Sequence, residues 1–117
     1  MIAVSGPQEA DVAEAVVSKY TRSDGTVVVQ VRGELDMGTE EGLKSLLVEL
    51  ATKVRPPSIV IDMAKLTFVD STGIGALAAG YNAAIENRVG FLVRDLAPAV
   101  EKSLRVAGLY RLFTGGA

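Results

Sequence analysis

A short uninterrupted apolar segment, SIVIDM (Ser58–Met63), constrains the fold most strongly, because it lies between two stretches with helical periodicity. A strand with one solvated face alternates apolar and polar residues, whereas a continuous apolar run is typical of a strand covered on both faces. Strands of this kind occur in domains where helices connect the strands and pack on the sheet. The segment therefore predicts a buried strand in an α/β domain.

Two amphipathic helices are predicted, one before and one after this strand. Their apolar stripes comprise Leu43, Leu46, Leu47, Leu50 and Val54 in the first helix, and Ile74, Leu77, Ala78, Tyr81 and Ile85 in the second. Both sets recur at the spacing of one helix face. Thr39 is the predicted N-cap of the first helix, and Pro56-Pro57 are expected to stop it.

The segments Ala15–Thr21 and Thr26–Gly33 are predicted strands joined by a tight turn at Ser23–Gly25. Asp-Gly between two β-prone runs favours a hairpin, so this pair should be antiparallel. Phe91–Val93 is predicted to be another buried strand. Because helices connect the later strands, those strands should be parallel to one another.

The C-terminal third predicts one further helix and one further strand. Pro98 stands near the start of the helical pattern and Gly108 just past its end, the usual asymmetry of these two residues. Leu109–Thr114 is interpreted as a last short strand. We therefore expect a loose arm over residues 1–13, then a single α/β domain over residues 14–117 with a mixed sheet of four to five strands.

The composition disfavours several classes of function. The chain of 117 residues contains no cysteine and no histidine, which removes disulfides, thiol catalysis, Ser–His catalysis and the usual zinc ligands. The net charge of −2 gives no support to nucleic-acid binding. The N-terminus does not resemble a signal peptide, and no apolar run is long enough to span a bilayer. We expect a cytoplasmic protein that is not an enzyme, without a cofactor or a metal.

The segment DSTGIG, which begins at Asp70, has two interpretations. In the structural one, Asp70 or Ser71 caps the helix, and Gly73 and Gly75 allow it to pack closely on a neighbour. In the functional one, Ser71 stands at the helix N-terminus, where the amides of Thr72, Gly73 and Ile74 are unpaired and could hold a phosphate on Ser71. The segment lacks the lysine of a nucleotide-binding P-loop and the first glycine of a GxSxG nucleophile motif.

The segment RGELDMGT (Arg32–Thr39) also joins a predicted strand to a predicted helix. In a parallel sheet the loops that follow the strands gather at one edge, so Asp36 and Asp70 should lie on the same edge. Such loop charges are commonly just solvated. Metal binding or acid–base chemistry is disfavoured, because no third carboxylate or histidine accompanies the pair.

Three segments together resemble the STAS domain family, in particular the bacterial anti-sigma factor antagonists. They are VRGELDMGTEEGLKSLL, SIVIDMAKLTFVDSTGIGALAAGY and PAVEKSLRVAGLYRLF, and the resemblance covers Val17 to Thr114. It implies a small α/β domain with helices mainly on one face of a mixed sheet. The chain ends at FTGGA, where many family members continue into a further helix.

The resemblance also implies a function and a site. Family members bind an anti-sigma factor that is also a serine/threonine kinase, which releases a sigma factor. The kinase then phosphorylates the serine after the aspartate, here Ser71, and a metal-dependent phosphatase reverses this. The implied partner-binding residues are Asp36, Met37, Gly38, Thr39, Asp70, Thr72, Gly73 and Ile74. The alternative is a STAS module of a signalling scaffold or of a membrane transport complex, without control of a sigma factor.

Overall fold

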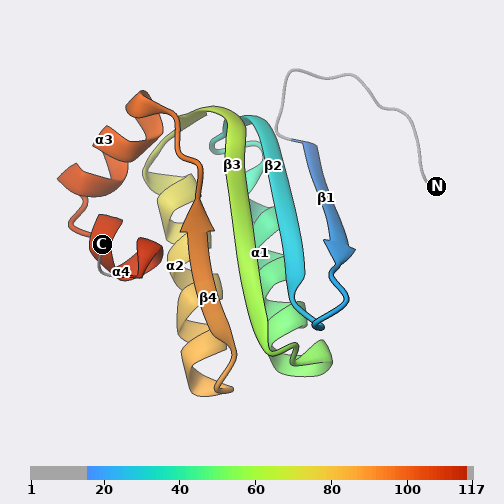
Figure 1. Ribbon diagram of the computed structural model, residues 1–117. Helices are drawn as coiled ribbons and strands as arrows, with labels where there is room; N and C mark the ends of the chain where they lie inside the picture. The colour runs from blue at the N-terminus through green and yellow to red at the C-terminus, as the bar shows by residue number, and fades with distance from the viewer. Residues whose placement is uncertain (1–15, 116–117) are drawn as a thin grey trace.

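Four strands form one mixed sheet in the computed structural model, which describes residues 16–115 (Figure 1). They are β1 (Val16–Thr21), β2 (Val27–Leu35), β3 (Ser58–Val69) and β4 (Gly90–Arg94), adjacent in that order. β1 is antiparallel to β2, whereas the β2–β3 and β3–β4 pairs are parallel. The mixed sheet is confirmed, and the predicted arm over residues 1–13 lies outside the described residues.

The predicted hairpin between β1 and β2 is confirmed. Thr21 and Val27 are the last paired residues, and Gly25 adopts a φ of +91° in the turn. The Asp24 carboxylate accepts a hydrogen bond of 2.9 Å from the Thr26 amide, which closes the turn locally. Glycine is suited to this φ because it has no Cβ.

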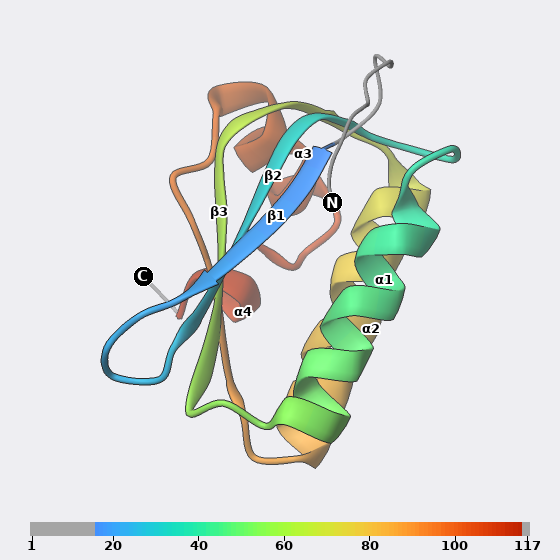
Figure 2. The same cartoon turned by 90° about the vertical axis from the view of Figure 1, so that its right-hand side faces the viewer.

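Helices α1 (Glu40–Glu49) and α2 (Ser71–Glu86) lie side by side on one face of the sheet (Figure 2). The π-helical segment η2 (Leu50–Val54) continues α1. Two further helices, α3 (Pro98–Val106) and α4 (Tyr110–Thr114), lie beyond the β4 edge in Figure 1. The helices therefore cover mainly one face, and the single α/β domain has the expected architecture.

The core fills the space between the sheet and the α1–α2 pair. Its fully buried members include Val29, Leu35, Leu43, Leu47, Ile59, Ile61 and Leu77. The two helices approach closely at Gly80, where an added Cβ would come within 2.7 Å of Leu47 Cδ1. The α2 surface against the core is therefore built from small residues as well as from Leu77.

Both predicted helix stripes are wrong at their C-terminal ends. Val54 is 58% exposed and Ile85 is 55% exposed. Val54 falls in η2, where the Arg55 amide donates to the Leu50 carbonyl, and the wider π-turn changes the angular spacing of the side chains. In α2 the buried side runs from Gly73 to Ala84, so Ile85 lies off it.

The strand β3 extends well beyond the predicted segment, and helices cover only one of its faces in the described part of the chain. Asp62 is half-buried, and Ala64 and Lys65 are exposed. Val60 is nevertheless buried on the open face, because it lies in a cross-strand row of apolar residues. That row comprises Tyr20, Val28, Val60 and Leu92. The apolar run thus reflects this row as well as the helix-covered core.

The predicted strand over Leu109–Thr114 is wrong, because the segment forms helix α4. The Phe113 amide donates to the Leu109 carbonyl at 3.0 Å, which is a helical hydrogen bond. Phe113 is fully buried, with its ring centroid 5.7 Å from those of Tyr81 and Phe91. The helical conformation turns Phe113 into this aromatic cluster, and the described sheet has four strands.

Candidate functional site

Asp36 and Asp70 follow neighbouring strands at the same edge of the sheet. Their preceding residues, Leu35 and Val69, are register partners in the parallel β2–β3 pair. The Asp70 amide donates a hydrogen bond of 3.2 Å to the Leu35 carbonyl, which ties the two loops together. The predicted shared edge is therefore confirmed.

Asp70 is the N-cap of α2. Its Oδ1 accepts hydrogen bonds from the Thr72 hydroxyl at 2.6 Å and from the Gly73 amide at 3.0 Å. The Thr72 hydroxyl, followed by the Gly73 amide, lowers the pKa of the Asp70 carboxyl below its ordinary value. Asp70 is therefore ionised at neutral pH, and its charge lies at the positive end of the helix dipole.

The amides of Thr72, Gly73 and Ile74 were expected to be unpaired, and this is wrong for two of them. The Gly73 amide donates to the Asp70 carboxylate, and the Ile74 amide donates to the Asp70 carbonyl at 2.9 Å. Of the two residues that could cap α2, Asp70 therefore provides the cap. Ser71, which is the first residue of α2, is left without a capping role.

Ser71 is exposed, and its hydroxyl makes no hydrogen bond to any residue in the 16–115 range. The side chain therefore contributes little to the local structure. A substituent on its oxygen would therefore not need to break the Asp70 cap.

The loop between β2 and α1 is held by short-range hydrogen bonds. Asp36 Oδ1 accepts from the Gly38 amide at 3.2 Å, and the Thr39 hydroxyl donates to the Glu34 carbonyl at 3.1 Å. Thr39 occupies the predicted N-cap position of α1, but its side chain does not cap the helix. The loop leaves Met37 76% exposed at the edge of the sheet.

The two glycines of the DSTGIG segment have different environments. Gly73 is buried, and an added Cβ would lie 2.6 Å from the Leu35 carbonyl oxygen. Gly75 has nothing within 4 Å of its added Cβ. Close packing therefore explains Gly73 alone. Gly73 is buried, and its lack of a side chain allows α2 to lie close to β2.

A groove of about 380 Å³ separates the start of α2 from α3. It is lined on one side by Asp70, Ser71 and Ile74, and on the other by Lys102, Ser103 and Val106. The α3 side was missed by the sequence reasoning. The sequence carried one sign of it, because Val106 does not share the helical spacing of Val100 and Leu104, which form the buried stripe of α3. In the structure Val106 is 81% exposed.

Large apolar side chains are exposed around this edge. Met37 follows β2, Phe68 lies near the end of β3, and Val106 borders the groove. Phe68 is 47% exposed and was also missed. Exposed apolar groups beside charged ones are typical of a protein–protein interaction surface. We call Asp36–Thr39, Phe68, Asp70–Thr72, Ile74, Lys102 and Val106 the switch edge.

The described residues give little support to metal chemistry at the switch edge. Among residues 16–115, no group of three or more Asp or Glu side chains is arranged to hold a metal ion. The Asp36 and Asp70 carboxylates each accept a hydrogen bond from a nearby backbone amide.

Within residues 16–115, no helix has the length and apolar character that crossing a membrane requires.

Fold and site together define a small α/β domain that presents an unpartnered serine at the start of a helix, beside exposed apolar side chains. The chain belongs to the STAS domain family, whose sequence profile matches residues 18–116.

Individual relatives carry more specific names. The chain is 27% identical over 88 residues to an anti-sigma F factor antagonist of Paenibacillus polymyxa, covering 75% of each protein. It is similar to a crystal structure of an anti-sigma factor antagonist from Mycobacterium paratuberculosis, at 29% identity and a TM-score of 0.73, covering 90% of this chain and 87% of that one.

The same fold occurs in proteins of another kind. A sulfate transporter family protein from Wolinella succinogenes is similar at 18% identity and a TM-score of 0.69, covering 83% of this chain and 77% of that one. At this identity the likeness concerns the fold alone. The fold therefore does not decide between regulatory and transport-associated roles, and the site residues must be considered.

Proposed function

We propose that the protein is an anti-sigma factor antagonist whose binding is controlled by phosphorylation of Ser71. The unphosphorylated protein binds an anti-sigma factor through the switch edge, and this releases a sigma factor. The observation that carries the proposal is the exposed Ser71 hydroxyl, directly after the capping Asp70 and without a hydrogen-bond partner among residues 16–115. The names of the relatives from Paenibacillus and Mycobacterium support the same role.

The local electrostatics support a switch at Ser71. A phosphoserine adds about −1.5 to −2 charges at neutral pH. Asp70 beside it is ionised, and Asp36 lies on the same edge. A partner that fits the exposed apolar groups and these acids would then meet a much more negative surface. Burying or opposing that charge in an interface weakens binding substantially.

The same modification should leave the fold intact. The first turn of α2 is held by the Asp70 cap and not by Ser71. Negative charge in the first turn of a helix is favoured by the helix dipole. The switch therefore acts through the charge of the surface, without unfolding of the domain.

This role implies particular partners and a setting. The anti-sigma factor is proposed to be the serine/threonine kinase that modifies Ser71, and a metal-dependent phosphatase is proposed to restore binding. The partner-binding residues are proposed to be Asp36, Met37, Gly38, Thr39, Asp70, Thr72, Gly73 and Ile74. The setting is the cytoplasm of a bacterium, where the protein would regulate transcription, for example in a stress response.

Capture from a lysate of the host tests this proposal. The baits are the wild type, Ser71→Ala, Ser71→Asp and a control, Ser45→Asp, which changes an exposed serine on α1. We expect an anti-sigma factor with kinase activity, identified by mass, on every bait except Ser71→Asp. If all four baits capture the same proteins, Ser71 does not control binding, and the chain acts as a STAS module of another assembly.

A further inference from the structure

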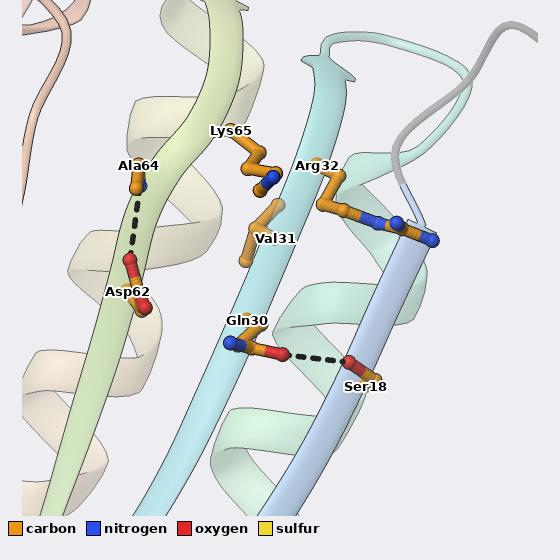
Figure 3. A pocket seen from close by; sticks show the side chains of 7 residues that line it. All are labelled: Ser18, Gln30, Val31, Arg32, Asp62, Ala64 and Lys65. Atoms are coloured by element: carbon orange, nitrogen blue, oxygen red, sulfur yellow. Dashed lines mark hydrogen bonds between the residues drawn. The ribbon is translucent and has the colours of Figure 1, made fainter.

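A second feature of the molecule lies on the open face of the sheet, away from α1 and α2. A cleft of about 260 Å³ is formed there by residues of β1, β2 and β3 (Figure 3). Its polar lining comprises Ser18, Gln30, Arg32, Asp62 and Lys65. None of these residues belongs to the switch edge.

A bulge in β3 brings two basic side chains together at this cleft. Arg32 pairs with Lys65 although Gln30 pairs with Asp62, so β3 places Met63 and Ala64 opposite the single residue Val31. If the side chains of β3 alternated regularly between the two faces after Asp62, the side chain of Lys65 would face the helices. The extra residue turns it to the open face instead, where it lines the cleft beside Arg32.

Arg32 and Lys65 are basic residues at paired positions of neighbouring strands, and neither is held in an ion pair within the described residues. Like charges on neighbouring strands repel and destabilise the pairing. Neither side chain forms an ion pair within residues 16–115, where the basic partners in ion pairs are Arg22, Arg94 and Arg105. Glu34, the next outward position on β2, is exposed but does not line the cleft. The chain thus keeps two basic residues at paired positions although its net charge is −2.

The acidic group of the cleft has another partner. Asp62 Oδ1 accepts a hydrogen bond of 3.0 Å from the Ala64 amide, so the carboxylate stabilises the bulge (Figure 3). Its register partner on β4 is Arg94, which lies on the side away from Arg32. Asp62 still places one negative charge in the cleft, so Arg32 and Lys65 leave a surplus of one positive charge there.

The neutral groups complete a set of donors. Ser18 donates a long hydrogen bond of 3.5 Å to the amide oxygen of Gln30. This leaves the Gln30 NH₂ group directed toward β3, on the side of the cleft (Figure 3). Lys65 and the Gln30 NH₂ group lie on the β3 side of the cleft, whereas the Arg32 guanidinium extends toward β1 (Figure 3). The exposed Arg32 side chain must therefore turn toward Lys65 to share an anion with it, and a guanidinium is well suited to the oxygens of a phosphate.

We propose that this cleft binds a phosphate group, either as free phosphate or as part of a small phosphate ester. The cleft lining carries two cations and one carboxylate, and this positive surplus together with the Gln30 amide donor favours an oxyanion over a neutral ligand. The cleft is smaller than the roughly 300–1,000 Å³ of sites for drug-sized molecules, which favours a small ligand.

The test is titration of the isotopically labelled protein with inorganic phosphate and, separately, with glycerol phosphate, followed by amide NMR shifts. Sodium chloride at matched ionic strength controls for screening. The variants are Arg32→Gln with Lys65→Gln, and a matched control Lys44→Gln on the exposed side of α1. We expect saturable shifts around Gln30, Arg32 and Lys65, with half-saturation on the order of 1 mM or below. The double variant should raise that concentration at least tenfold, and the control should not.

Four results would overturn the proposal. These are shifts that do not saturate, shifts that chloride reproduces, shifts confined to the start of α2, and a double variant that titrates like the wild type. Tighter binding of glycerol phosphate than of phosphate would identify the ligand as an ester, and the reverse would identify it as the free anion.

Discussion

Asp70 and Ser71 are adjacent residues with separate tasks. The Asp70 carboxylate holds the first turn of α2 through the Thr72 hydroxyl and the Gly73 amide, while Ser71 is exposed. Because the cap does not depend on Ser71, a change of charge at Ser71 can alter recognition without altering the helix. Two predictions at the scale of single residues test this division, and a third tests the packing at the start of α2.

Replacing Ser71 by Asp should leave the fold intact. An acidic residue in the first turn of a helix is favoured by the dipole, and the exposed position offers room for it. We expect a melting temperature close to that of the wild type. As a contrast, Asp70→Ala, which removes the cap, should lower it clearly. A drop of many degrees for Ser71→Asp would mean that Ser71 is part of the packed structure.

The pH dependence of stability should carry a signature of Asp70. Its pKa is lowered in the folded state, so the stabilising effect of its charge is present above the unfolded pKa, about 3.9, and is lost as the pH falls through the lowered value. Asp70→Asn keeps a capping acceptor without the charge. Urea unfolding from neutral to acidic pH should show the wild type more stable near neutrality, with the difference shrinking in acid. A difference independent of pH would contradict the assignment.

The two glycines at the start of α2 should respond oppositely to alanine. In Gly73→Ala the new Cβ would meet the Leu35 carbonyl oxygen at 2.6 Å, so we expect a loss of about 1–3 kcal/mol, as for overpacking. In Gly75→Ala the Cβ meets nothing, and the better helix propensity should stabilise the protein by up to about 1 kcal/mol. Denaturant unfolding of both variants checks this, and equal effects would contradict the packing described.

At the scale of elements, long periodic segments were predictable and short ones were not. The leucine stripe of α1 spans several turns, so its interpretation was correct from Leu43 to Leu50. Leu109–Thr114 is too short for periodicity to separate a strand from a helix. Contacts of Phe113 with Tyr81 and Phe91, which lie far away in the sequence, determine its conformation. The β3 bulge likewise depends on pairing with β2.

The α1 stripe supplies the prediction at this scale. Leu47 is fully buried and packs against Gly80 of α2, so Leu47→Ala should cost about 2–5 kcal/mol of unfolding free energy. Val54, at the end of the predicted stripe, is mostly exposed, and Val54→Ala should change stability by no more than about 0.5 kcal/mol. Chemical denaturation of both variants makes the comparison. Similar costs for the two would show that the helix packs on another face.

At the scale of the whole molecule, part of the switch edge could be predicted from the sequence. Asp36 and Asp70 were expected together because parallel strands end at one edge. The off-stripe position of Val106 in α3 was visible in the sequence, but that Lys102 and Val106 would lie beside Ser71 could not be expected, because this depends on how α3 packs beside α2. The switch edge and the open-face cleft share no residues, so variants at one should leave the other unchanged.

The most direct test of the central claim is the affinity of the protein for its captured anti-sigma factor, measured with and without phosphate on Ser71. Thr72→Val, phosphorylated and unphosphorylated, serves as a control for modification of the neighbouring hydroxyl. We expect phosphorylation at Ser71 to raise Kd at least tenfold, about 1.4 kcal/mol, with little change in melting temperature. Equal Kd values for the two forms would contradict the proposed switch.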